Sequence, residues 1–421
     1  MMRRKILAIV VAGIVLAGGA LGLLMTSHNK PIKVGILHSL SGTMAISESA
    51  VVDAALMAID EINAAGGLLG RQIQPVVADG ASDPAVFARE TERLIKVEGV
   101  STIFGCWTSA CRRTIRPVIE ANNHLLFYPV QYEGLEQSPN IVYLGAAPNQ
   151  QIVPAVEWAL RTDRKRLFLV GSDYVFPRVA NAIIRDYMKK WRGEIVGERY
   201  LLLGSHDVDD IVAEIVKRRP DAILNTINGD SNIAFFRALR ASGIMPKDIL
   251  TISFSISENE LDSIDSDLVA GDIASWNYFQ SLDEASNHNF VANFKARYGK
   301  DRVIGDPMAA AYEGVYLWAR AVVAAGSAKV NEIRAKVGHS SFHGPSGIAY
   351  IDAENQHLWK KVRLGRIRGD GQFDIIWSSE IPIRPEPYPA LRTRAEWEAF
   401  LKKLYDGWGG RWSNPGPGKT G

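Results

Sequence analysis

A repeated alternation of strand and helix patterns constrains this chain more than any other feature of its sequence. Residues 31–37 form a β-branched run, and residues 50–63 then carry apolar side chains at helical spacing. The alternation continues with a strand pattern at 73–78, a helix pattern at 84–97 and a second set over 150–254. Such alternation is typical of parallel sheets that helices cover on both faces, so the sequence predicts an α/β fold with two lobes of similar plan.

Length and charge limit the classes of protein to which the chain can belong. Its 421 residues are enough for two hydrophobic cores, and its 48 Lys and Arg nearly balance 46 Asp and Glu. The sequence has no basic stripe with interleaved aromatics, so we do not expect nucleic acid as a partner. Its eight His are scattered without paired spacing, and we expect neither a metal site nor a cofactor.

The N-terminus has the pattern of an export signal. Arg3, Arg4 and Lys5 precede an uncharged apolar run over residues 6–25. A basic stretch before an apolar run directs export, so we expect a periplasmic protein. The run is also long enough to cross a bilayer, and two outcomes stay open: cleavage after Ala20, or retention of the run as a tether to the inner membrane.

Polar residues follow two of the predicted strands at the point where each strand ends. Residues 105–111 read Gly-Cys-Trp-Thr-Ser-Ala-Cys after the apolar run 102–104, and a second apolar run at 125–128 breaks at a proline. Thr108 or Ser109 would cap a helix whose free N–H groups attract a carbonyl oxygen or a carboxylate. Because ligands of parallel sheets bind beyond the carboxyl ends of the strands, the sequence predicts a small-molecule site here.

Cysteine is sparse in this chain. Cys106 and Cys111 are its two cysteines, and both lie in the first of these strand-end segments. This number excludes a disulfide framework and a Cys-rich zinc site. We interpret the pair as two small buried residues near a helix start. One local disulfide is the alternative if the protein works in an oxidising compartment.

Motifs along most of the chain carry a resemblance to one known family. They occupy residues 62–71, 105–109, 128–134, 138–143, 171–174, 225–232, 355–357 and 372–377. In these segments the chain resembles the substrate-binding proteins of ABC importers with a type I periplasmic-binding fold, and most closely the urea and short-chain amide branch. The resemblance extends over residues 32–388. It implies a binding protein without enzymatic activity, which closes two lobes on urea or a short-chain amide and delivers it to ABC permease subunits.

The export pattern, the pass along the chain and the resemblance together divide the chain into segments. Residues 1–30 would be the signal peptide or membrane anchor, and residues 391–421 a C-terminal helix with a flexible tail from residue 407. The resemblance implies that the first lobe takes residues 31–146 and 277–345, and the second lobe residues 147–276 and 346–390.

An amide offers one carbonyl acceptor, several N–H donors and two flat faces, and the candidate residues can be matched to these groups. Ser109 fits the carbonyl oxygen, while Trp107 and Tyr174 fit the two faces. Asp230 and two tyrosine hydroxyls are the expected acceptors for N–H groups. The full set of expected ligand-binding residues is Trp107, Thr108, Ser109, Tyr128, Val130, Gln131, Tyr132, Tyr174 and Asp230.

Plainer interpretations stay open for these residues and for the function. Trp107 could be an aromatic residue of the core and Ser109 only a helix cap. Asp230 could only stabilise a turn. An amidase with a cysteine nucleophile has no nucleophile elbow or Cys/His signature to support it. A sensor domain that acts through a separate partner protein is the alternative to a transport function.

Overall fold

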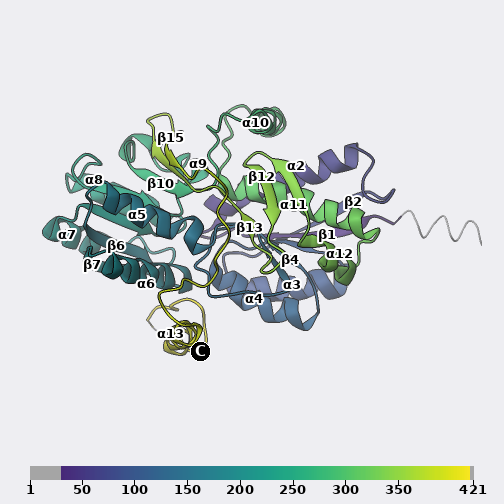
Figure 1. The fold of residues 1–421 in the computed structure, drawn as a ribbon, viewed down its shortest axis with the longest axis horizontal. Coiled ribbons are helices and arrows are strands. Elements are labelled where there is room, and N and C mark those ends of the chain that lie inside the picture. Colours follow the sequence, from purple (N-terminus) through teal and green to yellow (C-terminus); the bar gives the residue numbers. More distant parts are fainter. Residues whose placement is uncertain (1–29, 418–421) are drawn as a thin grey trace, which may run out of the picture.

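The structure is a computed structural model that describes residues 30–417. Figure 1 shows two lobes side by side along the longest axis of the molecule, each with a sheet between helices. This confirms the predicted α/β fold with two lobes. The predicted export segment, residues 6–25, lies outside the described residues. Within residues 30–417, no helix has the length and apolar character of a membrane span.

The first lobe is built on a parallel sheet of five strands in the order β2-β1-β3-β4-β5. The strands are β1 (Ile32–His38), β2 (Ile73–Asp79), β3 (Ile103–Gly105), β4 (Leu126–Tyr128) and β5 (Ile141–Tyr143). Their β-branched and aromatic side chains are buried on both faces in β3, β4 and β5, as expected for the interior of a covered parallel sheet.

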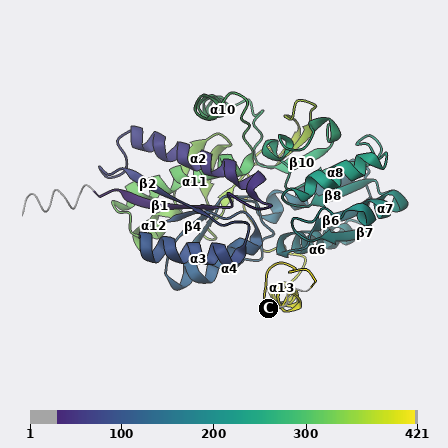
Figure 2. The same ribbon diagram turned by 180° about the vertical axis from the view of Figure 1, so that it is seen from behind.

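Helices cover both faces of this sheet. The helices of this lobe are α2 (Ala45–Ala64), α3 (Pro84–Arg93), α4 (Ser109–Ala121), α10 (Ala285–Tyr298), α11 (Asp306–Ala325) and α12 (Val330–Val337). The helix α2 packs against α11 on one face and α3 packs against α4 on the other, as Figure 2 shows from behind. The apolar residues that predicted a helix at 50–63 are thus the side of α2 that is buried in the first core.

The second lobe repeats this plan with a seven-stranded sheet in the order β15-β14-β10-β9-β8-β6-β7. The strands are β6 (Arg166–Ser172), β7 (Glu194–Leu201), β8 (Ala222–Thr226), β9 (Leu250–Ser253), β10 (Ile273–Trp276), β14 (Arg363–Ile367) and β15 (Phe373–Ser378). The strands β6 to β10 are parallel, whereas β14 and β15 add antiparallel strands at one edge. The helices of this part are α5 (Ile152–Arg161), α6 (Val175–Lys190), α7 (Asp209–Arg218), α8 (Ser231–Ala241), α9 (Glu258–Leu261) and α13 (Arg394–Gly407).

A small antiparallel sheet helps to locate the boundary at which the chain passes from the first lobe to the second. It consists of β11 (Ser341–Gly344), β12 (Gly347–Ile351) and β13 (Leu358–Trp359). Ala349, Ile351 and Leu358 from this sheet are part of the first hydrophobic core. Their packing favours a lobe boundary near residue 360 over the predicted boundary at 346, and we propose the later position.

The C-terminal segment differs from the flexible tail predicted from residue 407. The backbone N–H of Val175 donates to the Trp412 carbonyl at 3.0 Å, and that of Asn414 donates to the Asp173 carbonyl at 2.9 Å. These backbone hydrogen bonds dock residues 412–414 on the second lobe.

Candidate ligand-binding site

The carboxyl ends of the strands in both lobes meet at the junction of the lobes. The first-lobe strands β1, β3 and β4 end at His38, Gly105 and Tyr128. Just beyond β4, the Gln131 side chain donates from Nε2 to the carbonyl of Phe254, which follows β9 of the second lobe, at 2.9 Å. The predicted wall residues therefore lie where the two lobes touch, which is the usual position of a ligand site in parallel sheets.

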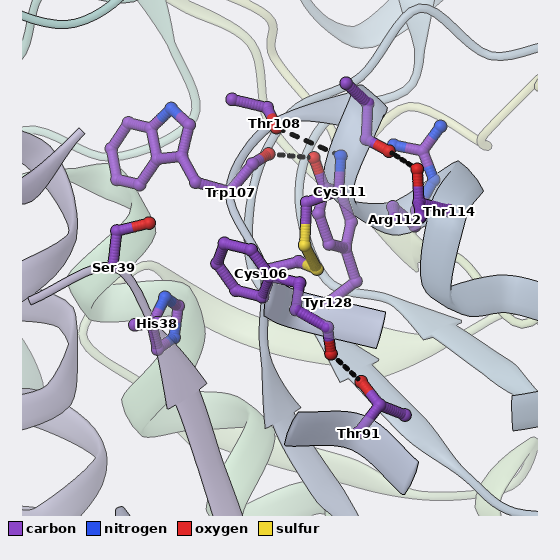
Figure 3. The surroundings of a disulfide bond; sticks show 12 residues. His38, Ser39, Thr91, Cys106, Trp107, Thr108, Cys111, Arg112, Thr114 and Tyr128 are labelled. Carbon is purple, nitrogen blue, oxygen red and sulfur yellow. Dashed lines mark hydrogen bonds between the residues drawn. A yellow bond between two sulfur atoms is a disulfide. The ribbon is translucent and has the colours of Figure 1, made fainter. Parts of the chain in front are cut away.

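The start of α4 forms one wall of this junction. Thr108 caps the helix as predicted, since its Oγ1 accepts from the Cys111 N–H at 3.1 Å. Cys106 and Cys111 form a disulfide, with 6.0 Å between their Cα atoms, so our interpretation of two free buried cysteines is wrong (Figure 3). Residue 105, just before the bonded pair, is a glycine, and a side chain at this position would clash with the Leu37 carbonyl. The disulfide thus encloses the segment that carries three of the predicted ligand contacts.

Trp107 lies within this enclosed segment. The side chain is only 3% exposed, and in Figure 3 its indole ring lies near Ser39, at the end of β1. Its Nε1 is buried and has no hydrogen-bond partner among residues 30–417. The Tyr128 hydroxyl donates to the Trp107 carbonyl at 2.5 Å, which fixes the backbone beneath the ring. The wall therefore combines a flat apolar surface with an unused donor.

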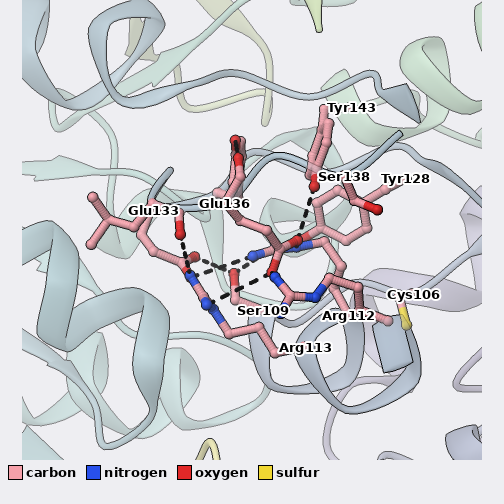
Figure 4. A network of polar contacts seen from close by, with 12 residues as sticks. Cys106, Ser109, Arg112, Arg113, Tyr128, Glu133, Glu136, Ser138 and Tyr143 are labelled. Atoms are coloured by element: carbon pink, nitrogen blue, oxygen red, sulfur yellow. Dashed lines mark hydrogen bonds and ion pairs between the residues drawn. The ribbon is translucent and has the colours of Figure 1, made fainter. Parts of the chain in front are cut away.

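A buried network of charges holds Ser109 from behind (Figure 4). Ser109 donates from Oγ to Glu133, and Arg112 donates from Nη1 to the same Oγ at 3.0 Å. Arg112 also pairs with Glu136 at 2.8 Å, and Arg113 pairs with Glu133 at 2.9 Å. All these charged side chains are almost fully buried, so each depends on the others for the interactions that water would otherwise supply.

Glu136 and Arg112 stay charged at neutral pH. Burial by itself raises the pKa of Glu136, but the nearby guanidinium groups of Arg112, Arg113 and Arg116 outweigh burial and lower the pKa to about 2. Burial opposes the charge of Arg112, yet Glu136 and Glu133 raise its pKa well above the ordinary value. Ser109 therefore accepts a hydrogen bond from a guanidinium group that the surrounding carboxylates keep charged.

Tyr132 belongs to a layer behind the wall. Its hydroxyl donates to the Glu136 carbonyl at 3.1 Å and lies 2.5 Å from Nε2 of His357. Its ring stacks on Tyr143 with 5.1 Å between centroids, and the Arg112 guanidinium lies 4.5 Å from its ring centre. Because the hydroxyl already has two partners, these contacts favour a supporting role over the predicted contact with ligand.

Val130 and Gln131 follow Tyr128 at the end of β4, as the sequence placed them. Val130 is buried, and its carbonyl lies so close to Gly145 that a side chain could not fit at that glycine. The Gln131 Oε1 is buried without a partner in the described part of the chain, although its Nε2 is bound to the second lobe. Gln131 thus offers a free acceptor at the junction.

Tyr174 brings the second lobe to the same place. It is buried at the start of α6, directly after β6. Burial raises the pKa of its hydroxyl well above the ordinary value, and the nearby Tyr128, Glu133 and Glu48 of the first lobe raise it further. Its hydroxyl therefore lies within the electrostatic reach of the first-lobe wall, as a residue facing a ligand between the lobes should.

Asp230 lies at the rim of the junction instead of its centre. Its side chain is 38% exposed, and its Oδ1 accepts from the Thr43 hydroxyl of the first lobe at 2.5 Å. His206 lies 3.8 Å from its other oxygen. This contact across the lobes favours a role in holding them together over the predicted role as acceptor for ligand N–H groups.

A buried group at the end of β1 is absent from the residues expected from the sequence. The Glu48 carboxylate on α2 accepts from the Ser39 N–H at 2.9 Å, and it lies 3.1 Å from Nδ1 of His38. Its charge is among those that act on the Tyr174 hydroxyl. The polar break after the strand at residues 40–43 is the sequence signal that marks this third strand end. Among residues 30–417, no cluster of His, Cys, Asp and Glu is arranged to hold a metal ion.

Comparison with known families identifies the class of protein. The periplasmic binding protein domain matches residues 32–394, and the chain belongs to this family. It is therefore a solute-binding protein of the kind that serves ABC transporters, and this family works outside the cytoplasmic membrane. Membership also implies a small-molecule ligand and a permease as partners.

Solved structures show the same fold at low sequence identity. A solute-binding protein of an ABC transporter from R. palustris, in complex with 4-hydroxybenzoate, is 23% identical with a TM-score of 0.76, covering 84% of this chain and 98% of that one. The branched-chain amino acid binding protein LivJ from Streptococcus pneumoniae, in complex with isoleucine, is 21% identical with a TM-score of 0.73, covering 84% of this chain and 100% of that one.

Curated relatives agree with this assignment. The Leu/Ile/Val-binding protein homolog 6 of Brucella melitensis is 22% identical over 354 residues, which are 80% of this chain and 87% of that protein. A protein named limonene hydroxylase from Geobacillus stearothermophilus is 42% identical, but over 118 residues only. Those residues are 28% of this chain and 22% of that protein, so the chain spans about a fifth of that relative.

Proposed function

We propose that this protein captures urea or a short-chain amide between its two lobes and delivers it to an ABC permease. The observation that carries the proposal is a pair of buried groups without partners among the described residues, the donor Nε1 of Trp107 and the acceptor Oε1 of Gln131. An amide carries both a carbonyl acceptor and N–H donors on a few atoms, so it can satisfy such a pair. Other buried polar atoms in the 30–417 range also lack partners, but these two groups follow strand ends at the junction of the lobes, which is the usual position of a ligand site.

The enclosure of the site supports a small ligand. The lobes touch through Gln131 and Phe254 at the centre and through Thr43 and Asp230 at the rim. The side chains of the walls are almost fully buried in this arrangement, which favours a ligand of few atoms.

Calorimetric titration of the purified protein tests the ligand class. We expect saturable binding of urea, formamide or acetamide, and no binding of isoleucine or 4-hydroxybenzoate at the same concentrations. Binding of isoleucine or 4-hydroxybenzoate alone would contradict the proposal, because those ligands carry a carboxylate and a larger side chain.

Trp107→Phe tests the residue that carries the proposal. The variant keeps a flat ring and loses the Nε1 donor, and one hydrogen bond contributes about 0.5–1.5 kcal/mol, so we expect a loss of affinity of about 2-fold to 10-fold. Trp318→Phe is the matched control, because Trp318 is also buried with an Nε1 that lacks a partner in the described chain, but it lies on α11 in the first core. An equal loss of affinity in both variants would show that Trp107 does not contact the ligand through its Nε1.

A further inference from the structure

The C-terminal segment, residues 385–416, lies along one edge of the molecule near the junction of the lobes. Figures 1 and 2 both place α13 there, away from the two sheets. The segment is anchored on α6 by a two-pronged ion pair between Arg392 and Asp186, with N–O distances of 2.6 and 2.9 Å. Trp397 is buried in the second core and donates from Nε1 to the Pro389 carbonyl at 3.1 Å. The segment is therefore a fixed part of the second lobe.

One end of this segment holds the second-lobe wall of the ligand site. The Val175 N–H donates to the Trp412 carbonyl at 3.0 Å, and Ser413 forms an antiparallel bridge with Tyr174. Asn414 holds Asp173 twice, through its backbone N–H at 2.9 Å and through its side-chain Nδ2 at 2.6 Å. The backbone on both sides of Tyr174 is thus hydrogen-bonded to residues 412–414.

The other end of the segment reaches the first-lobe wall. The Leu135 N–H donates to the Pro387 carbonyl at 2.7 Å, next to Glu133, which holds Ser109. Gly134 has a φ of +74°, and a side chain there would meet the same Pro387 carbonyl. The Arg113 guanidinium also lies 5.0 Å from the ring of Trp412. One segment therefore contacts the backbone or side chains of both walls.

We propose that the C-terminal segment is a positioning element of the ligand site, which holds the Tyr174 wall and the Glu133 wall in their ligand-binding arrangement. The inference rests on the proposed function, since it assigns the segment a share in the affinity for that ligand. A ligand between walls that the segment holds must in turn stabilise the segment, because coupling between two sites is reciprocal. The segment thus acts on binding without touching the ligand.

Two variants with a matched control test this inference. Asn414→Ala removes one side-chain contact with Asp173, and a chain that ends at residue 410 removes all contacts of residues 412–416. Lys402→Ala is the control, because Lys402 lies on the exposed side of α13, where it pairs with Asp406 of the same helix. We expect Asn414→Ala to weaken binding of urea or acetamide about 3-fold to 10-fold, the truncation to weaken it more, and Lys402→Ala to leave it unchanged.

Hydrogen exchange separates positioning from a general loss of stability. We expect the Val175 amide to exchange faster in the truncated chain than in the full chain, while amides in the core strands β6 and β8 exchange at the same rate. In the full chain, saturating urea or acetamide should slow exchange at residues 412–414. Lys402→Ala should reproduce both results of the parent protein.

Failure of the inference is distinguishable from failure of the proposed function. If the parent binds an amide and both the truncated chain and Asn414→Ala bind it equally well, the inference is overturned and the proposed function stands. If the parent binds no amide, the proposed function fails. The exchange rate at Val175 then decides the positioning role, and an unchanged rate in the truncated chain overturns it.

Discussion

Glu258 shows, at the scale of one residue, how burial changes a carboxyl group at the junction of the lobes. Burial raises the pKa of Glu258 to about 8. Its Oε1 accepts a hydrogen bond from the Gln280 N–H at 2.7 Å, and this bond acts in the opposite direction and lowers the pKa. The nearby Glu260 and Asp306 raise the pKa further. Its Oε2 is buried and has no partner in the part of the chain that the structure describes. We therefore expect Glu258 to hold a proton at neutral pH.

Glu258→Gln tests this protonation. The pKa of Glu258 is raised from its ordinary value of 4.5 to about 8 in the folded protein. The protonated carboxyl group therefore contributes fully to stability below pH 4.5, and this contribution is lost as the pH rises through about 8. Glutamine keeps the acceptor for Gln280 and cannot ionise. We expect the variant to gain on the order of a few kcal/mol in free energy of unfolding over the parent at pH 9, and little at pH 5.

The measurement compares unfolding by guanidinium chloride at several pH values, since urea is a proposed ligand. His124 and His357, whose pKa values burial lowers to about 4 and 3, destabilise both proteins alike in acid and cancel in the difference. Glu398→Gln on the exposed face of α13 serves as control. A difference between Glu258→Gln and parent that does not change with pH would show that Glu258 is ionised throughout.

At the scale of one element, the start of α4 depends on a cap, a disulfide and a charge network at once. Thr108 caps the helix, Cys106 and Cys111 close the segment covalently, and Arg112 and Glu133 hold Ser109 from behind. Cys106 itself adopts a left-handed φ of +62°. These three constraints keep the donors and the indole ring of the segment in one arrangement.

Removal of the disulfide should loosen this element. A chain with Cys106→Ala and Cys111→Ala loses a closed loop of few residues, which in the chain-entropy account costs about 2 kcal/mol of stability. We expect this loss in guanidinium unfolding under oxidising conditions, together with weaker binding of the amide ligand. Adding a reducing agent should destabilise the parent and leave the double variant unchanged. Equal stability of parent and variant without reductant would show that the bond contributes nothing to the fold.

At the scale of the whole molecule, the structure has its two lobes in contact. Thr43 meets Asp230 at the rim and Gln131 meets Phe254 at the centre. Gln151 donates to the carbonyls of Phe254 and Ser275 beside the crossing points of the chain. A ligand that contacts both walls binds this closed arrangement better than an open one, so it must shift the population toward closure.

Small-angle scattering tests closure. We expect a smaller radius of gyration with saturating urea or acetamide than without ligand. Asp230→Ala and Thr43→Val should each raise the Kd about 2-fold to 10-fold, because each removes the same hydrogen bond of the closed form. The double variant should cost no more than either single variant, since the two residues act through one another. Additive losses would show that Asp230 contacts the ligand by itself.

The sequence alone determined the features that depend on neighbours along the chain. The alternation of apolar patterns, at strand and at helix spacing, predicted the α/β fold with two lobes because it fixes which face of each element is buried. The cap at Thr108 and the placing of residues 105–111 and 128–134 beyond strand ends followed from the same local reasoning. These features need no knowledge of distant partners.

Only the tertiary structure decided which distant groups meet. Arg112 and Glu133 lie 21 residues apart, and Tyr132 and His357 lie 225 residues apart, so no local pattern pairs them. The docking of Trp412 on Val175 joins two residues that are far apart along the chain, and it lies in a stretch that the sequence predicted as a flexible tail. The order of strands in the two sheets brings these groups together, and that order follows from packing the whole chain.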